Sequence, residues 1–113
     1  MAVFSKVILS GSTDGRPVSV TQTATAGDLI HTADATAIDE VWLYAVNRHT
    51  ADVVLTIELG GVSAGDLVTV TLTAGGGPVL VIPGTPMTNS LVVRAFADTT
   101  AVVSVFGWVN RIT

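Results

Sequence analysis

The chain contains no cysteine among its 113 residues. Disulfides, thiolate metal sites and cysteine nucleophiles are therefore excluded together, and stability has to come from packing and association. Histidine is also scarce. His31 and His49 are the only two, and neither has a second histidine or a carboxylate at ligand spacing in the sequence. We therefore expect no metal site.

Charged residues are also scarce. Charged residues make up 12% of the chain, against about 25% in a typical soluble domain, while hydrophobic residues make up 49%. A small domain has a high surface-to-volume ratio, so this few charges leave much of its surface apolar. The composition predicts a surface that is largely covered by partners, and therefore a homo-oligomer.

Basic residues are too few and too dispersed to bind nucleic acid. The net charge is −4, and the basic residues stand singly along the chain: Lys6, Arg16, Arg48, Arg94 and Arg111. No basic stripe is present to neutralise phosphates, so no nucleic-acid partner is expected.

A membrane partner is not expected either. The longest uncharged stretch, residues 67–93, is broken by the turn at 75–78 and by Pro83 and Pro86, so it cannot form a spanning helix. Residues 1–11 lack the basic start and extended apolar run of a secretory signal.

The sequence is rich in features typical of β-strands. Apolar and polar residues alternate with period two, valine and threonine are frequent, and glycine, proline and aspartate punctuate the pattern. Eight or nine strands are predicted, from segments at residues 3–10, 17–25, 28–33, 38–48, 52–59, 67–73, 78–82, 90–97 and 101–111. The predicted fold is all-β, a two-layer antiparallel β-sandwich of jelly-roll-like or Greek-key type, with an N-terminal arm or strand over 1–16 and the sandwich over 17–113.

Short turns predict three antiparallel hairpins. They would join 38–48 with 52–59, 67–73 with 78–82, and 90–97 with 101–111. Because most neighbouring strands of a jelly roll are distant in sequence, these hairpins fit a strict jelly roll poorly, and the topology stays open.

Two kinds of strand are expected. Strand 52–59 has one wet face, with Thr56 and Glu58 pointing to solvent, and 67–73 alternates valine or leucine with exposed threonine. Strands 41–46 and 102–109 are instead apolar on both faces, and the large aromatic residues lie on one of them: Trp42, Tyr44, Phe106 and Trp108. Only one face of a sandwich strand can meet the core. The aromatic face is therefore covered either by a loop or the N-terminal segment, or by a subunit interface.

No catalytic mechanism can be written from these residues. No serine stands in a G-x-S-x-G elbow, and the glycines at 75–77 join two strands without a following lysine, so they form a turn and not a phosphate-binding loop. The carboxylates Asp34, Asp39 and Glu40 do not match a calcium loop and are expected to be solvated. The chain is predicted not to be an enzyme, with no catalytic, cofactor-binding or metal-binding residues.

Several stretches resemble small β-structured virion proteins of tailed bacteriophages, of the capsid decoration (cement) type. They are residues 7–12 with 15–17, 39–47, 80–84, 91–97 and 107–112. The resemblance implies a location in the virion capsid after synthesis in the host cytoplasm, with the major capsid protein as partner. It also implies association into trimers or dimers. The residues themselves predict the N-terminal arm: segment 1–10 is apolar and is followed by the turn-rich stretch 11–17, with Phe4 as the candidate contact.

Capsid decoration is accordingly the function expected. Two alternatives remain: a tail, fibre or head–tail component of the virion, and a carbohydrate-binding module. The last would require an exposed aromatic platform beside Asp or Asn, with Trp42 or Trp108 as the ring.

Overall fold

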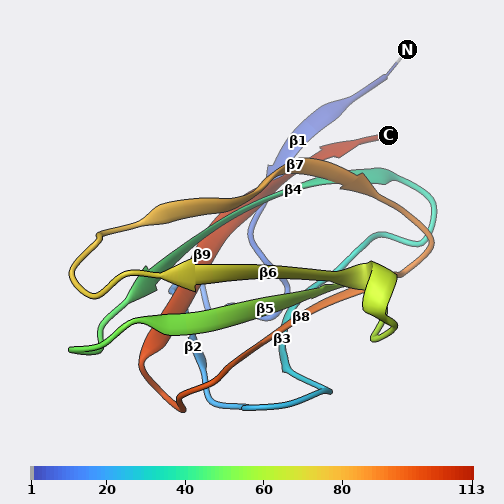
Figure 1. Ribbon diagram of the computed structural model, residues 1–113. Coiled ribbons are helices and arrows are strands. Elements are labelled where there is room, and N and C mark those ends of the chain that lie inside the picture. The colour runs from blue at the N-terminus through green and yellow to red at the C-terminus, as the bar shows by residue number, and fades with distance from the viewer. Residues whose placement is uncertain (1) are drawn as a thin grey trace.

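The computed structural model describes residues 2–113, and its regular secondary structure consists almost entirely of β-strands (Figure 1). The strands are β1 (Phe4–Val7), β2 (Val18–Val20), β3 (Asp28–Thr32), β4 (Ile38–Asn47), β5 (Val53–Leu59), β6 (Leu67–Leu72), β7 (Val79–Met87), β8 (Val92–Ala97) and β9 (Val103–Ile112). A single 3₁₀ turn, η1 (Ala64–Asp66), separates β5 from β6. The all-β prediction is confirmed. Within the described residues, no helix has the length and apolar character needed to cross a bilayer.

The strands form two antiparallel sheets. Sheet A has the order β1-β9-β4-β7, and β2 also pairs with β9; sheet B has the order β3-β8-β5-β6. Strand β4 pairs with β9 along its whole length. The other side of β9 is shared: β1 pairs with Val109–Ile112 and β2 with Val103–Val105. From β2 to β9 the chain changes sheet at every step except between β5 and β6, which is the jelly-roll order. The predicted sandwich is therefore confirmed.

The three predicted hairpins are wrong. Strands β4 and β5, β6 and β7, and β8 and β9 lie in opposite sheets. The loops between them (48–52, 73–78 and 98–102) are long enough to cross the roughly 10 Å between packed sheets, so their length did not distinguish a hairpin from a crossing. Asn47 secures the first crossing, because its side-chain amide donates to the carbonyls of Ala51 and Leu72, both at 2.9 Å.

Strand β7 runs past the predicted end at residue 82. It continues through Pro83 and Pro86 to Met87, with two register shifts against β4. Proline removes a backbone donor, which a strand can tolerate only where one side has no neighbour. The edge position of β7 therefore explains the longer strand.

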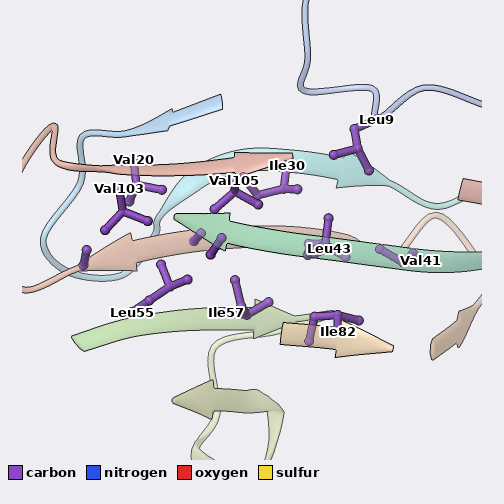
Figure 2. Packing of buried hydrophobic residues seen from close by; sticks show 14 of the residues in the cluster. Leu9, Val20, Ile30, Val41, Leu43, Leu55, Ile57, Ile82, Val103 and Val105 are labelled. Carbon is purple, nitrogen blue, oxygen red and sulfur yellow. The ribbon is translucent and has the colours of Figure 1, made fainter. Parts of the chain in front are cut away.

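The core lies between the sheets. In Figure 2, Leu55 and Ile57 of β5 point into the space between the sheets, which Leu43 of β4 also occupies. Leu43, Leu55 and Ile57 are fully buried, and each such side chain contributes about 1.5–3 kcal/mol relative to exposure. The predicted inward faces of β4, β5 and β9 are the faces that pack here.

The N-terminal segment adds an edge strand and then enters the core. Val3 and Thr113 exchange backbone hydrogen bonds of 2.8 and 2.9 Å, and β1 continues the pairing along β9. Phe4 is 73% exposed, whereas Leu9 is 2% exposed. The Gly11 amide then donates to the Ile30 carbonyl at 2.9 Å. The segment therefore lies beside β9 in sheet A and is attached to β3 of sheet B.

Candidate functional site: the aromatic outer face of sheet A

Four aromatic rings lie on the outer face of sheet A, where they form one stack. Trp42 is opposite Trp108, and Tyr44 is opposite Phe106, in the β4–β9 register. The ring centroids are 5.9 Å apart for the first pair and 5.8 Å for the second, and Tyr44 and Trp108 are 6.1 Å apart. We call Trp42, Tyr44, Phe106 and Trp108 the aromatic ladder. Each such pair adds about 0.5–1.5 kcal/mol beyond its area burial.

The ladder is half-buried, and its neighbours cover part of it. The Lys6 ammonium lies 5.4 Å from the centroid of the Trp108 ring. Gly84 of β7 lies under Trp42, where an added Cβ would come within 2.6 Å of a ring atom. The structure thus brings together the four predicted interface residues. Phe4 lies at the far end of β1, outside the stack.

A polar row borders the ladder. Lys6, Asn110 and Glu40 are direct neighbours across β1, β9 and β4. With Phe4 and Ser5 they line a hollow of about 260 Å³. The outer face of sheet A therefore combines stacked aromatic rings with a few polar groups, the composition found in the centre and rim of protein–protein contacts.

The same geometry disfavours a sugar site. A saccharide stacks on the open face of an aromatic ring. The two tryptophans that could serve as the platform both have neighbours against the ring: Trp42 stacks on Trp108 and lies against Gly84, and Trp108 also stacks on Tyr44 and lies under the Lys6 ammonium. These neighbours leave little open ring face for a saccharide.

A second polar cluster lies inside the molecule, at the end of the sandwich. Asp39, expected to be solvated, has no exposed surface. The Arg111 Nε donates to its Oδ1 at 2.7 Å, Arg111 Nη2 to its Oδ2 at 3.0 Å, and the Asp34 amide to Oδ2 at 3.1 Å. His31 Nε2 lies 2.8 Å from the same Oδ2. The expectation of a solvated Asp39 is therefore wrong.

The histidine of this cluster has a defined tautomer. The Ser10 amide donates to His31 Nδ1 at 3.0 Å, so Nδ1 accepts and Nε2 carries the proton that is donated to Asp39. The Ser10 hydroxyl accepts a hydrogen bond from the Thr32 amide at 2.7 Å, and the contact of Ser10 with the ring comes from its backbone. The arrangement is thus not a Ser-His-Asp catalytic triad.

These contacts keep Asp39 ionised. Burial by itself raises the pKa of Asp39, but the hydrogen bonds from Arg111, His31 and the Asp34 amide outweigh it and lower the pKa to about 2. The same carboxylate raises the pKa of Arg111. The Asp34 carboxylate accepts from the amides of Ala37 and Thr36, which lower its pKa. We call His31, Asp39 and Arg111 the ionic cluster; it joins β3, β4 and β9.

Glu58 is a further buried carboxylate that the alternation placed in solvent. It is 1% exposed, and Thr56 beside it on the same face is 6% exposed. The Thr25 hydroxyl and the Gly27 amide each donate to Glu58 at 2.6 Å. The segment between β2 and β3 therefore covers this part of the outer face of sheet B, and the prediction of a wet face is wrong for Thr56 and Glu58.

The sequence did contain a signal for the ionic cluster. Asp39 shares its parity with the inward residues of β4, and Arg111 shares its parity with those of β9. Opposite charges at inward positions of two strands predict a buried pair when the strands are known to be neighbours. Glu58 had no such signal, because a loop distant in sequence buries it.

Among residues 2–113, no group of three or more histidine or acidic side chains is arranged to hold a metal ion. Comparison with protein-family models, with curated proteins and with solved structures found no significant match to this chain.

Proposed function

We propose that this protein is a structural component of a tailed-phage virion, a capsid decoration protein that stabilises the head by binding major capsid subunits. The observation that carries the proposal is the aromatic ladder, which places Trp and Tyr on the outer face of a sheet in a chain with 12% charged residues. Trp and Tyr are enriched at the energetic centres of protein interfaces. The ladder is the surface proposed to contact the capsid.

The architecture supports this role. Jelly rolls occur in viral capsid proteins, although the fold is also used by lectins and so gives only an analogy. A decoration protein must resist strain without disulfides. Here the ionic cluster joins β3, β4 and β9, while Leu9 anchors the N-terminal segment in the core. Phe4, 73% exposed on the edge strand β1, is the proposed arm contact.

A decoration protein stabilises a shell by linkage. It binds the assembled shell and not the separate subunits, so the shell gains stability in proportion to the logarithm of free protein over its dissociation constant. Heads stripped of the protein should lose DNA at a lower temperature and regain resistance when it is added back. Labelled protein should bind heads and leave tails bare.

Two variants test which surface is used. Phe4→Asp and Trp108→Asp should each weaken head binding at least tenfold, which corresponds to about 1.4 kcal/mol. Val62→Asp is the matched control, because Val62 is 56% exposed in the loop after β5, away from the ladder. Thermal unfolding of each variant separates a binding defect from a folding defect.

The outcomes separate the candidate functions. Label confined to the tail or baseplate would move the assignment to a tail, fibre or head–tail component. If Trp108→Asp binds heads as well as the control, the ladder is not the contact; if Phe4→Asp does, the arm is not. A chain that binds no part of the virion would refute the proposal as a whole.

A further inference from the structure

The edges of the two sheets differ in how they are protected from pairing with another strand. Edge strand β7 carries two prolines and two register shifts. Strand β1 has four residues, one of them Lys6. Strand β3 has a register shift, and Gly11 and Ser10 bind its backbone at Ile30 and Thr32. These features are the usual protections of a sheet edge.

Strand β6 has none of them. It is the other edge of sheet B, and its residues 67–72 (LVTVTL) include no charge and no proline. It pairs with β5 along its whole length without a register shift (Figure 1). An unprotected edge of high β-propensity is a template for a further strand.

The hydrogen-bond directions show which groups of β6 are free. The Val54 carbonyl accepts from the Asp98 amide, and the Val54 amide donates to the Asp98 carboxylate, so Val54 faces the β8 side of β5. Backbone groups alternate sides along a strand, so Leu55 faces β6 and bonds its partner Val70. The backbone groups of Thr69 and Thr71 therefore point outward, and none has a partner within residues 2–113.

At each end of this edge, one backbone group already has a hydrogen-bond partner within the chain. At the start of β6, the Leu67 amide donates to the Ala64 carbonyl, which leaves the Leu67 carbonyl free. After the end of β6, the Thr73 carbonyl accepts from the Gly76 amide at 3.1 Å, which leaves the Thr73 amide free. The free donor at one end thus corresponds to a free acceptor at the other.

We propose that β6 binds β6 of a second copy of this chain, antiparallel, about a two-fold axis at Val70. In this register each Thr69 pairs with the partner copy's Thr71 and exchanges two hydrogen bonds. Each Thr73 amide donates to the Leu67 carbonyl of the other copy. The engaged Leu67 amide and Thr73 carbonyl lie opposite each other, so no polar group loses a partner. Moving the axis to Thr69 or Thr71 would place an engaged group against a free one.

The side chains fit the same register. On the core side, Val70 meets Val70, and Val68 meets Leu72 of the other copy. On the outer side, Thr69 meets Thr71, a favourable cross-strand pair. Residues 67–73 carry no charge, so two copies of an acidic chain meet here without like-charge repulsion. Pairing along an edge of this length buries less than the roughly 1,200 Å² of a standard interface. The dimer should therefore be weak and dissociate on dilution.

Cysteine scanning tests the register, since the chain has no cysteine of its own. Val70 would form a non-hydrogen-bonded pair with itself, with Cα atoms about 4.5 Å apart, which a disulfide can bridge. Val70→Cys should give a covalent dimer under mild oxidation. Thr71→Cys is the matched control, because its two copies lie beyond the roughly 7 Å limit. Cross-linking of Thr71→Cys but not Val70→Cys would overturn the register.

Charge substitution tests the interface itself. The double variant Thr69→Lys/Thr71→Lys puts like charges opposite each other and should weaken dimerisation at least tenfold in sedimentation equilibrium. Thr69→Lys/Thr71→Glu puts opposite charges there and should restore it. Both positions are exposed, so both variants should unfold at wild-type temperatures. A wild-type protein that stays monomeric at hundreds of micromolar, or equal dimerisation of the two variants, would overturn the proposal. Neither result depends on a phage particle, so the capsid proposal is tested separately.

Discussion

Replacing Arg111 with methionine tests what the ionic cluster contributes to stability. Methionine keeps much of the length of the side chain and removes its charge. The Asp39 carboxylate then stays buried with only His31 and the Asp34 amide as partners. Removing one partner of a buried ion pair costs about 3–5 kcal/mol. The Arg111 side chain is 26% exposed, so solvent screens part of this interaction and the lower end, about 3 kcal/mol, is expected.

The pKa of Asp39 also predicts how the stability loss changes with pH. The pKa of Asp39 is about 2 in the folded protein and about 3.9 in an unfolded chain. A lowered folded-state pKa stabilises the protein above pH 4, and this contribution, of order 2–3 kcal/mol, is lost as the pH falls from 4 to 2. In Arg111→Met the main contact that lowers the pKa is gone. The variant should therefore lose less stability on acidification, and the gap to wild type should narrow.

Urea unfolding followed by tryptophan fluorescence at pH 7, 5 and 3 measures both effects. Asp34→Asn is the matched control: Arg111 Nη1 lies 3.8 Å from Asp34 Oδ1 in a partly exposed pair that solvent screens, so this variant should lose much less stability than Arg111→Met. The double variant Asp39→Asn/Arg111→Met removes both charges and should recover part of the loss. A loss below about 1 kcal/mol for Arg111→Met, with an unchanged acid response, would refute the reasoning.

Three further substitutions test other parts of the fold. Leu9→Ala should cost about 2–5 kcal/mol in urea unfolding, whereas deleting residues 1–7 should leave a folded chain with cooperative melting, since β1 is largely exposed. Gly84→Ala should lower the melting temperature and change the near-ultraviolet circular dichroism, because φ is +72° there and the new Cβ would meet the Trp42 ring; an unchanged spectrum would contradict this contact. Glu58→Ala should cost about 1–3 kcal/mol, because it leaves the buried Gly27 amide unpaired, whereas the hydroxyl of the exposed Thr25 can turn to water; a loss below about 1 kcal/mol in urea unfolding would show that water replaces the carboxylate at Gly27.

Much of the candidate site follows from the alternation of residues along single strands. In β4, Val41 and Leu43 are buried and Trp42 lies on the other face, as predicted. The same holds for Val105 and Phe106 in β9. Side-chain direction reverses at each residue of a strand, so this information is local. The all-β class and the aromatic face were therefore predictable without knowledge of strand pairing.

The sequence alone could not show which strands are neighbours. The loop at 48–52 fits a hairpin as well as a crossing, and the choice depends on contacts such as that of Asn47 with Leu72, 25 residues away. The ladder also needed this information, because Trp42 stacks on Trp108 only when β4 and β9 pair.

The burial of the charged residues also depends on which segments are neighbours in the fold. Asp39 and Arg111, although inward by parity, became a hydrogen-bonded pair only through the pairing of β4 with β9, and Glu58 became buried only through the distant segment at 25–27. The sequence by itself determined the all-β class and which residues of a strand share a face, because side-chain direction alternates residue by residue. The tertiary structure decided the sheets, the ionic cluster and the free edge at β6, because these depend on the packing of segments far apart in the chain.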